Sequence, residues 1–558
     1  MPSLMGSLYI GVSGLQTSQN ALNTTAHNMT NVDTKGYVRQ QVQLGTRFYN
    51  TIAVTPKAVS NQQLGLGVNY SKVKQIRDYF LDQTYRRESG REAFYEISAT
   101  TLEEVENLLD EMVGEPFQLS LKNLWEAVQE ASKDPNSVVT QGLLVQRSAQ
   151  FLERSQLVYQ GLVDYQDNMN NQIVGKVDTI NKYAKQILAL NDEIVKIEAG
   201  KQESANDLRD ERNRILDELG SMANISYDED ILGYVSVQIE GVDLVKGEVA
   251  YEMGLYEDEV TGFYTPFWVQ NATYTVNDRG EKEYDIDGAE VFNLNTTISS
   301  DLNTDIGSLK AMLLARGDHH ADYRDLEESK YENSVSQSII MNIQAEFDQL
   351  IHNICTTINK VFADAAEAAT AKNPNSTYLR DSEGKPIQFF EKIGSEGYTK
   401  DPVTGQWTYN AEDPNVYGTT YSVANLQMNA ELMQNPGMLG LKQIDESVDY
   451  NIMEELKNKF EEESNVLNPH VKKKTNFMDY YGDLVAQIAN SGKVYKDILF
   501  NQEATVNATF TAREQVIGVS TDDELTYMVK FQNAYNASSR YINAINEMLA
   551  HIINTLAV

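Results

Sequence analysis

The sequence predicts an elongated, multidomain α+β protein that is mainly α, with paired coiled-coil helices from its two ends. Apolar residues recur at steps of three and four near both ends of the chain. A long helical face lies between them, and two central segments change to strand and turn composition. With 558 residues, the chain is long enough for several domains and a large core.

The first predicted element is a helix close to the N-terminus. Its apolar seam has coiled-coil spacing and contains Leu8, Val12, Leu15, Leu22 and Met29. Gln19 and Ala26 occupy two further positions of this seam and weaken it. The segment is also rich in Ser, Thr and Asn, which favour caps and turns over helix interiors. We therefore expect this helix to need neighbouring chains for its stability.

The next part of the chain, up to residue 225, is predicted to be mostly helical. "GLGV" at residues 65–68 indicates a turn that leads into a strand. "REAFYEISATTLEEVENLL" and "FQLSLKNLWEAVQEASKDP" are amphipathic, and Pro135 ends the second of these helices. Apolar residues from Leu162 to Ile197 then keep to one face, which predicts one long helix and a rod-like bundle.

Two inserts interrupt the helical pattern. At "YVSVQIEG", Val235, Val237 and Ile239 alternate with polar residues, as in a half-buried strand. We expect residues 226–300 to form a β-rich outer insert. Residues 372–440 are rich in Gly, Pro, Asn and Tyr, which predicts a second insert of loops or strands.

The C-terminal part returns to helix, with a break at "NPHVKKK" and a second, stronger seam at the end. This seam contains Phe531, Tyr535, Ile542, Ile545, Leu549 and Ile552. We expect residues 1–60 and 515–558 to pair as a terminal coiled-coil unit of a hairpin-shaped molecule. The helical rod-like domain is then expected over residues 61–225, 301–371 and 441–514.

Composition excludes several classes of partner. Acidic residues outnumber basic ones 81 to 46, and the net charge of -35 opposes phosphate backbones and anionic lipid surfaces. No apolar stretch is long enough to span a bilayer, and the N-terminal residues lack the pattern of a cleavable secretory signal. We expect no nucleic-acid partner and no membrane insertion. The single cysteine, Cys355, lies in an apolar run and is expected to be a buried, inert thiol.

The chain has no HExxH, Walker A, GxSxG or CxxC pattern, so we expect no catalytic, cofactor-binding or metal-binding residues. The polar cluster "RGDHHADYRD" contains adjacent histidines, which do not chelate as an i, i+4 pair would. We interpret it as a solvated helix end rather than a metal site or an integrin-binding tripeptide. In "ANDLRDERNRILDEL" acidic and basic residues interleave, and Asp210 with Arg214 has i, i+4 spacing. This favours a neutralised helix face over carboxylate catalysis.

The N-terminal residues resemble the axial proteins of the bacterial flagellum, which include rod, hook and hook-associated proteins. The shared motif is carried here by Ser13, Gly14, Asn28, Asn31, Gly36 and Tyr37. "GYVRQ", "ANDLRDERNRILDEL" and the C-terminal "VIGVSTDDELTYMVKFQNAYNASS" are similar to segments of members at the hook–filament junction. His27 and Met29 stand where Asn and Ile are more usual in the family, and Gly11 replaces a common Ala.

The resemblance implies a structural, non-enzymatic subunit that joins hook to filament outside the cell. It implies export in an unfolded state by the flagellar type III export apparatus, and folding during assembly. The implied partners are hook protein, the second hook–filament junction protein, further copies of the chain in a ring, and a cytoplasmic export chaperone at the C-terminal helix. Two alternatives stay open: another flagellar axial protein, such as hook or second junction protein, and a secreted coiled-coil adhesin or effector.

Overall fold

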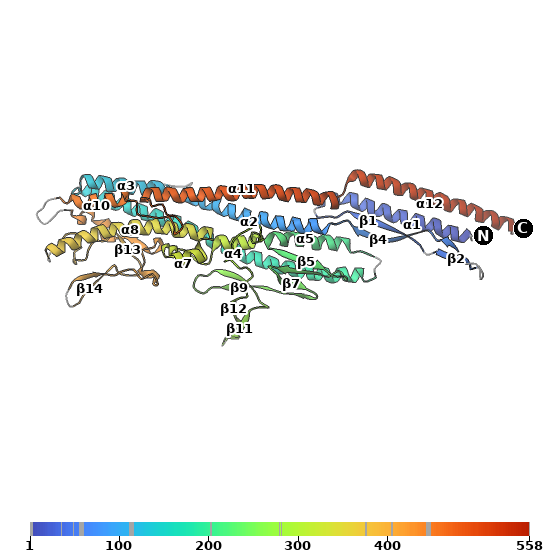
Figure 1. Ribbon diagram of the computed structural model, residues 1–558, viewed down its shortest axis with the longest axis horizontal. Helices are drawn as coiled ribbons and strands as arrows, with labels where there is room; N and C mark the ends of the chain where they lie inside the picture. The colour runs from blue at the N-terminus through green and yellow to red at the C-terminus, as the bar shows by residue number, and fades with distance from the viewer. Residues whose placement is uncertain are drawn as a thin grey trace.

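The computed structural model is an elongated molecule whose long helices run along its length, with both chain ends at the same end (Figure 1). It describes residues 4–556 apart from 35, 48, 55–60, 111–115, 201–202, 278, 281, 374–375, 403–404 and 442–447. The predicted fold class, α+β with mainly α structure, is confirmed. None of the described helices is both long enough and apolar enough to cross a membrane.

Helices form the body of the molecule. They are α1 (Leu4–Thr30), α2 (Tyr79–Asp110), α3 (Phe117–Lys133), α4 (Val138–Glu198), α5 (Asn206–Met222), α6 (Ser308–Arg316), α7 (Glu328–Lys330), α8 (Ile339–Lys372), α9 (Ala430–Gln434), α10 (Tyr450–Glu461), α11 (Phe477–Ile517) and α12 (Thr521–Leu556). The long helix α4 begins earlier than its predicted face, because Leu144, Phe151 and Leu152 continue the buried stripe toward its N-terminus.

The strands form small antiparallel sheets. Near the N-terminus β1 (Gln40–Thr46) pairs with β4 (Val68–Gln75), and β2 (Tyr49–Val54) with β3 (Asn61–Gly65). The first insert holds a four-stranded sheet and two hairpins, formed by β5 (Ile225–Glu229), β6 (Val235–Ile239), β7 (Val242–Lys246), β8 (Val249–Ala250), β9 (Met253–Glu257), β10 (Tyr264–Trp268), β11 (Thr273–Val276) and β12 (Lys282–Asp285). The second insert holds β13 (Phe390–Lys392), β14 (Tyr398–Lys400), β15 (Trp407–Tyr409) and β16 (Leu426–Met428).

The shaft, formed by α2, α3, α4, α5, α8 and α11, contains the main hydrophobic core. Phe117 lies at one aromatic centre, with ring centroids of Phe151, Phe347 and Tyr481 at 5.7, 4.9 and 4.8 Å. The buried residues of α4 recur at helical spacing and pack onto neighbouring shaft helices. Both inserts project from one long side of the shaft (Figure 1). Cys355 is buried in this core, as predicted.

Beyond the shaft, α1 and α12 pack side by side and form the terminal pair (Figure 1). Two glycines let these helices approach closely. A Cβ atom at Gly11 would lie 2.7 Å from Cγ1 of Ile542, and one at Gly14 would lie 2.7 Å from Oγ of Ser538. Any larger side chain at these positions would push the two helices apart.

The interpretation of "RGDHHADYRD" as a solvated helix end is wrong. Arg316 is 2% exposed, and its guanidinium donates to the Tyr264 carbonyl at 2.9 Å and covers the Phe263 ring. The ring of His319 lies between Asp318 and Asp325, at 2.6 and 3.1 Å. The pattern alone could not show this burial, because the covering residues come from the first insert.

Candidate functional site: the joint between terminal pair and shaft

The joint is the region where the terminal pair meets the shaft. It consists of residues 36–40, which follow α1, residues 75–82, which connect β4 to α2, the helix α5, and residues 513–524 at the corner between α11 and α12. Much of the family motif seen in the sequence lies here or leads into it.

Asn28 holds the chain as it leaves α1. Its Oδ1 accepts hydrogen bonds from the Tyr37 hydroxyl at 2.8 Å and the Gln40 amide at 3.0 Å, and its Nδ2 donates to the Gln40 carbonyl at 2.9 Å. Burial raises the pKa of Tyr37, so its hydroxyl keeps the proton that it donates. Gly36 has a φ of 83°, which favours glycine at the turn before Tyr37. Asn28, Gly36 and Tyr37 of the motif therefore together fix the path of the chain after α1.

The other motif residues stabilise α1 and its contact with the β1–β4 hairpin. Ser13 donates to the Ile10 carbonyl at 2.8 Å and accepts from the Val68 amide at 3.3 Å. Asn31 Nδ2 donates to the His27 carbonyl at 3.0 Å in the last turn of the helix. Gly14 instead faces α12, as described above, so the motif serves two separate contacts.

Asp210 on α5 binds the terminal side of the joint. It accepts from the Val38 amide at 3.2 Å and from Gln75 Nε2 at 2.8 Å, and Arg77 Nη1 lies 3.8 Å away. Burial raises the pKa of Asp210 to about 7, and these donors only partly offset the effect of burial.

The predicted pairing of Asp210 with Arg214 is therefore wrong. Arg214 binds its own helix neighbours, Glu211 at 2.6 Å and Glu218 one turn further on. Asp210 faces the segments that come from the terminal pair, and spacing within one helix cannot reveal such partners.

Charged residues complete the joint, among them Arg39 and Glu524 from the segments that resemble the flagellar proteins. Arg39 donates its amide to the Ile517 carbonyl at 2.8 Å and forms an ion pair with Glu524, also at 2.8 Å. Arg513 is ion-paired with Asp82 and Asp217, both at 2.8 Å. The Glu524 and Arg513 side chains are 3% and 7% exposed. Ion pairs this deeply buried fix the joint, because loss of one partner would leave a buried charge.

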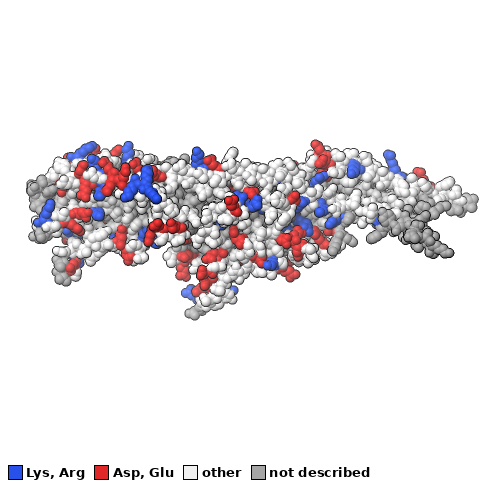
Figure 2. All heavy atoms as spheres, in the orientation of Figure 1, with Lys and Arg blue, Asp and Glu red and all other residues white. Residues whose placement is uncertain are grey.

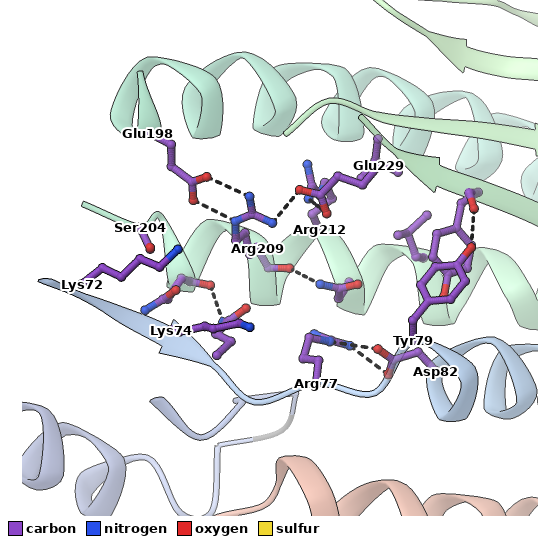
Figure 3. Close-up of a pocket in the computed structure, with 16 residues that line it drawn as sticks. Lys72, Lys74, Arg77, Tyr79, Asp82, Glu198, Ser204, Arg209, Arg212 and Glu229 are labelled. Carbon is purple, nitrogen blue, oxygen red and sulfur yellow. Dashed lines mark hydrogen bonds and ion pairs between the residues drawn. The ribbon is translucent and has the colours of Figure 1, made fainter. Parts of the chain in front are cut away.

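A cavity of about 390 Å³, the joint hollow, lies between β4, the start of α2, the end of α4, α5 and β5 (Figure 3). Arg209 forms a bidentate ion pair with Glu198, with both hydrogen bonds at 2.8 Å, and a second ion pair with Glu229 at 2.7 Å. Burial lowers the pKa of Arg212 to about 10. The described residues show no cluster of three or more His, Cys, Asp or Glu side chains suited to a metal ion.

The seam residues on the terminal pair are only partly covered. Leu8, Leu15, Leu22, Met29, Phe531, Tyr535, Ile542 and Leu549 are half-buried, and Ile545 is buried. Val12 and Ile552 remain 36% and 37% exposed. Larger exposed fractions belong to apolar residues beside the seams, among them Tyr9, Val529, Met548 and Ile553.

The terminal pair also carries few charges. The helix α1 contains no Asp, Glu, Lys or Arg, and from Leu525 onward α12 has only Lys530, Arg540 and Glu547. The space-filling view shows this end mostly white, whereas red and blue side chains crowd the shaft (Figure 2). A surface with few charges costs less to remove from water, so the terminal pair is suited to burial between chains.

Comparisons with known proteins found family matches to the helical shaft and to both helices of the terminal pair. Residues 102–373 match the family "Flagellar hook-associated protein FlgK helical domain". Residues 8–37 match "Flagella basal body rod protein", and residues 516–555 match "Flagellar basal body rod FlgEFG protein C-terminal". The last two matches cover the terminal pair and reach into the joint.

Relatives match over nearly the whole chain. Flagellar hook-associated protein 1 of Bacillus subtilis is 23% identical over 565 residues, covering 99% of both chains. The protein of the same name from Salmonella typhimurium is also 23% identical, covering 97% of this chain and 98% of the relative. The solved flagellar hook junction protein FlgK from Burkholderia pseudomallei shares the fold, with a TM-score of 0.51 and 11% identity over 79% of this chain and all of that one. Over nearly its whole length, the chain is therefore similar to flagellar hook-associated protein 1.

Proposed function

We propose that the chain is a structural subunit of the bacterial flagellum that joins the hook to the filament. The observation that carries this proposal is the terminal pair: two helices with few charges, whose apolar seams are only half covered within one chain. Such seams require further chains to bury them. The relatives that the chain resembles are named as hook-associated proteins of the flagellum, and we propose no catalytic role.

The partners follow from the same surfaces. Copies of the chain form a ring in which the terminal pairs pack against one another, with hook protein on one side and the second junction protein on the other. We place the end of the N-terminal part of this unit after residue 75 rather than at residue 60, because β1 pairs with β4. The predicted boundary at residue 60 itself lies outside the described residues.

The chain must leave the cell to reach the hook–filament junction that we propose. We propose that the chain crosses the flagellar type III export apparatus unfolded, reaches the cell exterior and folds during assembly. The composition of α1 supports this, since Ser, Thr and Asn residues make a weak helix without neighbours. Before export, a cytoplasmic chaperone covers the seam of α12.

Deletion of the gene tests the proposal. Electron microscopy of deleted cells should show hooks without filaments, with flagellin released into the medium, and a plasmid copy should restore filaments. Normal filaments in the deleted strain would refute the junction role. Cells that lack the hooks themselves would instead favour the alternative that the chain is hook protein.

A further inference from the structure

The joint hollow carries more positive charge than its own carboxylates neutralise. The cationic residues that line it are Lys72, Lys74, Arg77, Arg209 and Arg212, and the acidic ones are Asp82, Glu198 and Glu229. The excess is unusual in a chain with a net charge of -35. In the close-up, Lys72, Lys74 and Arg77 follow β4 and its exit, across from the arginines of α5 (Figure 3).

The positive charge without a carboxylate partner belongs to Lys72 and Lys74. Each arginine of the hollow has a carboxylate partner: Asp82 for Arg77, at 2.9 Å, and Glu229 for Arg212, at 3.2 Å, with Arg209 bound as described above. Lys72 and Lys74 are exposed, and neither is within 4.0 Å of a carboxylate oxygen of any described residue. Because they are two residues apart on β4, both ammonium groups lie on the same face of the strand.

Two buried donors in the same walls also make no hydrogen bond to a described residue, although Nη1 of Arg77 lies 3.8 Å from the Asp210 carboxylate. Among the described residues, Nη1 of Arg77 and Nε of Arg212 have no hydrogen-bond partner, although both atoms are buried. The Arg212 side chain is only 1% exposed. Guanidinium and ammonium groups donate hydrogen bonds and accept none, so a ligand suited to this hollow must supply acceptor oxygens and negative charge.

We propose that the joint hollow receives a carboxylate side chain from a neighbouring copy of the chain. This inference rests on the proposed ring, and it identifies a specific contact within that ring. Each neighbour presents many acidic residues, and the hollow is lined by β4, which contacts α1 of the terminal pair through the bond from Val68 to Ser13. The contact fixes how the neighbour sits against both the β1–β4 hairpin and the shaft, because the hollow is lined by β4 and α5 together.

Charge reversal tests the proposal. The double variant Lys72→Glu/Lys74→Glu should keep the melting temperature and the export of the wild type, because both side chains are exposed and unpaired. The fraction of cells with filaments should fall roughly twofold to thirtyfold, the weakening expected from two disrupted surface charge contacts. Lys182→Glu/Lys493→Glu is the matched control, since both lysines are exposed shaft residues and the charge change is the same. Normal filament numbers in the Lys72/Lys74 variant would overturn the proposal, whereas filaments in the deletion strain would instead refute the junction role.

Zero-length coupling of amines to carboxylates identifies the occupant. In isolated hook–filament junctions, Lys72 or Lys74 should be joined to an acidic peptide of this same chain, and in the purified monomer the product should be absent. Coupling to a peptide of another axial protein would overturn a second copy as the occupant. Protection of Lys72 and Lys74 in the monomer by inorganic phosphate at millimolar concentration would show a site for a free anion, and would overturn it as well.

Discussion

Asp210 is the residue at which the electrostatics of the joint can be measured. Its carboxyl group is buried, and it holds the Val38 amide and the Gln75 side chain that arrive from the terminal side. Burial raises its pKa to about 7 in the folded protein, whereas an unfolded chain releases this proton at roughly pH 4. Between these values the folded state binds more protons, so the contribution of Asp210 to stability falls as pH rises.

Substitution of Asp210 by Asn should remove this dependence. Between pH 5 and pH 8, we expect the free energy of unfolding of Asp210→Asn to rise relative to that of the wild type by on the order of 2–4 kcal/mol. Denaturant titrations of both proteins across this range give the difference. Asp207→Asn is the control, because it removes a carboxylate from the same helix at a side chain that is 76% exposed. A difference that does not change with pH for Asp210→Asn would contradict the expectation.

At the scale of the element, α1 depends on close packing against α12 more than on its own helix propensity. Ser13, Thr17 and Ser18 are buried or nearly so, and each hydroxyl donates to a carbonyl one turn earlier in the helix. These hydroxyls form hydrogen bonds within α1 and add little apolar contact with α12. The approach at Gly11 and Gly14 therefore decides how well the terminal pair holds together.

Substitution of Gly14 by Val should loosen the terminal pair without melting the shaft. The added carbons meet Ser538 on α12, and overpacking of this kind costs about 1–3 kcal/mol. Hydrogen exchange of α1 amides should accelerate roughly fivefold to a hundredfold, while α4 amides keep their protection. Gly175→Val on α4 provides a comparison, since nothing lies within 4 Å of a Cβ atom there. Equal α1 exchange in the two variants would rule out the role of the glycine contact.

The whole molecule is a hairpin whose two ends share one surface with few charges. The seams of α1 and α12 face each other only in part, and apolar residues such as Val529 and Met548 stay 57% and 53% exposed. An exposed apolar stripe of this kind promotes aggregation at cytoplasmic concentrations. We propose that a chaperone covers the same stripe before export and that neighbouring chains cover it afterwards.

Substitution of Ile542 and Leu549 by Asp tests whether a chaperone binds the seam of α12. Because the change removes apolar contacts on α12, we expect the yield of chaperone-bound chain and its export to fall several-fold, measured in cell and medium fractions. Ile231→Asp is a suitable control, since Ile231 is fully exposed on a loop of the first insert. Unchanged yield and export of the double variant would contradict chaperone binding at this seam.

Periodicity in the sequence determined the helices, the seams and the strand at Val235. Local spacing decides whether a segment can present one apolar face, so α4 and α12 were predictable without a structure. The terminal motif likewise indicated the flagellar family before any contact was known. The pairing of the two ends into a hairpin followed because each seam needs a partner and the chain offers few others.

Tertiary structure alone decided the joint. The partners of Asp210, Arg39 and Arg513 lie far away in sequence, so no spacing rule could reveal them. The buried environment of "RGDHHADYRD" depended in the same way on residues of the first insert. Periodicity reports which face of an element is apolar, whereas the energy of a buried charge depends on which distant group meets it. For this reason the sequence determined the helices and the resemblance to flagellar axial proteins, and the fold decided how the terminal pair and the shaft are held together.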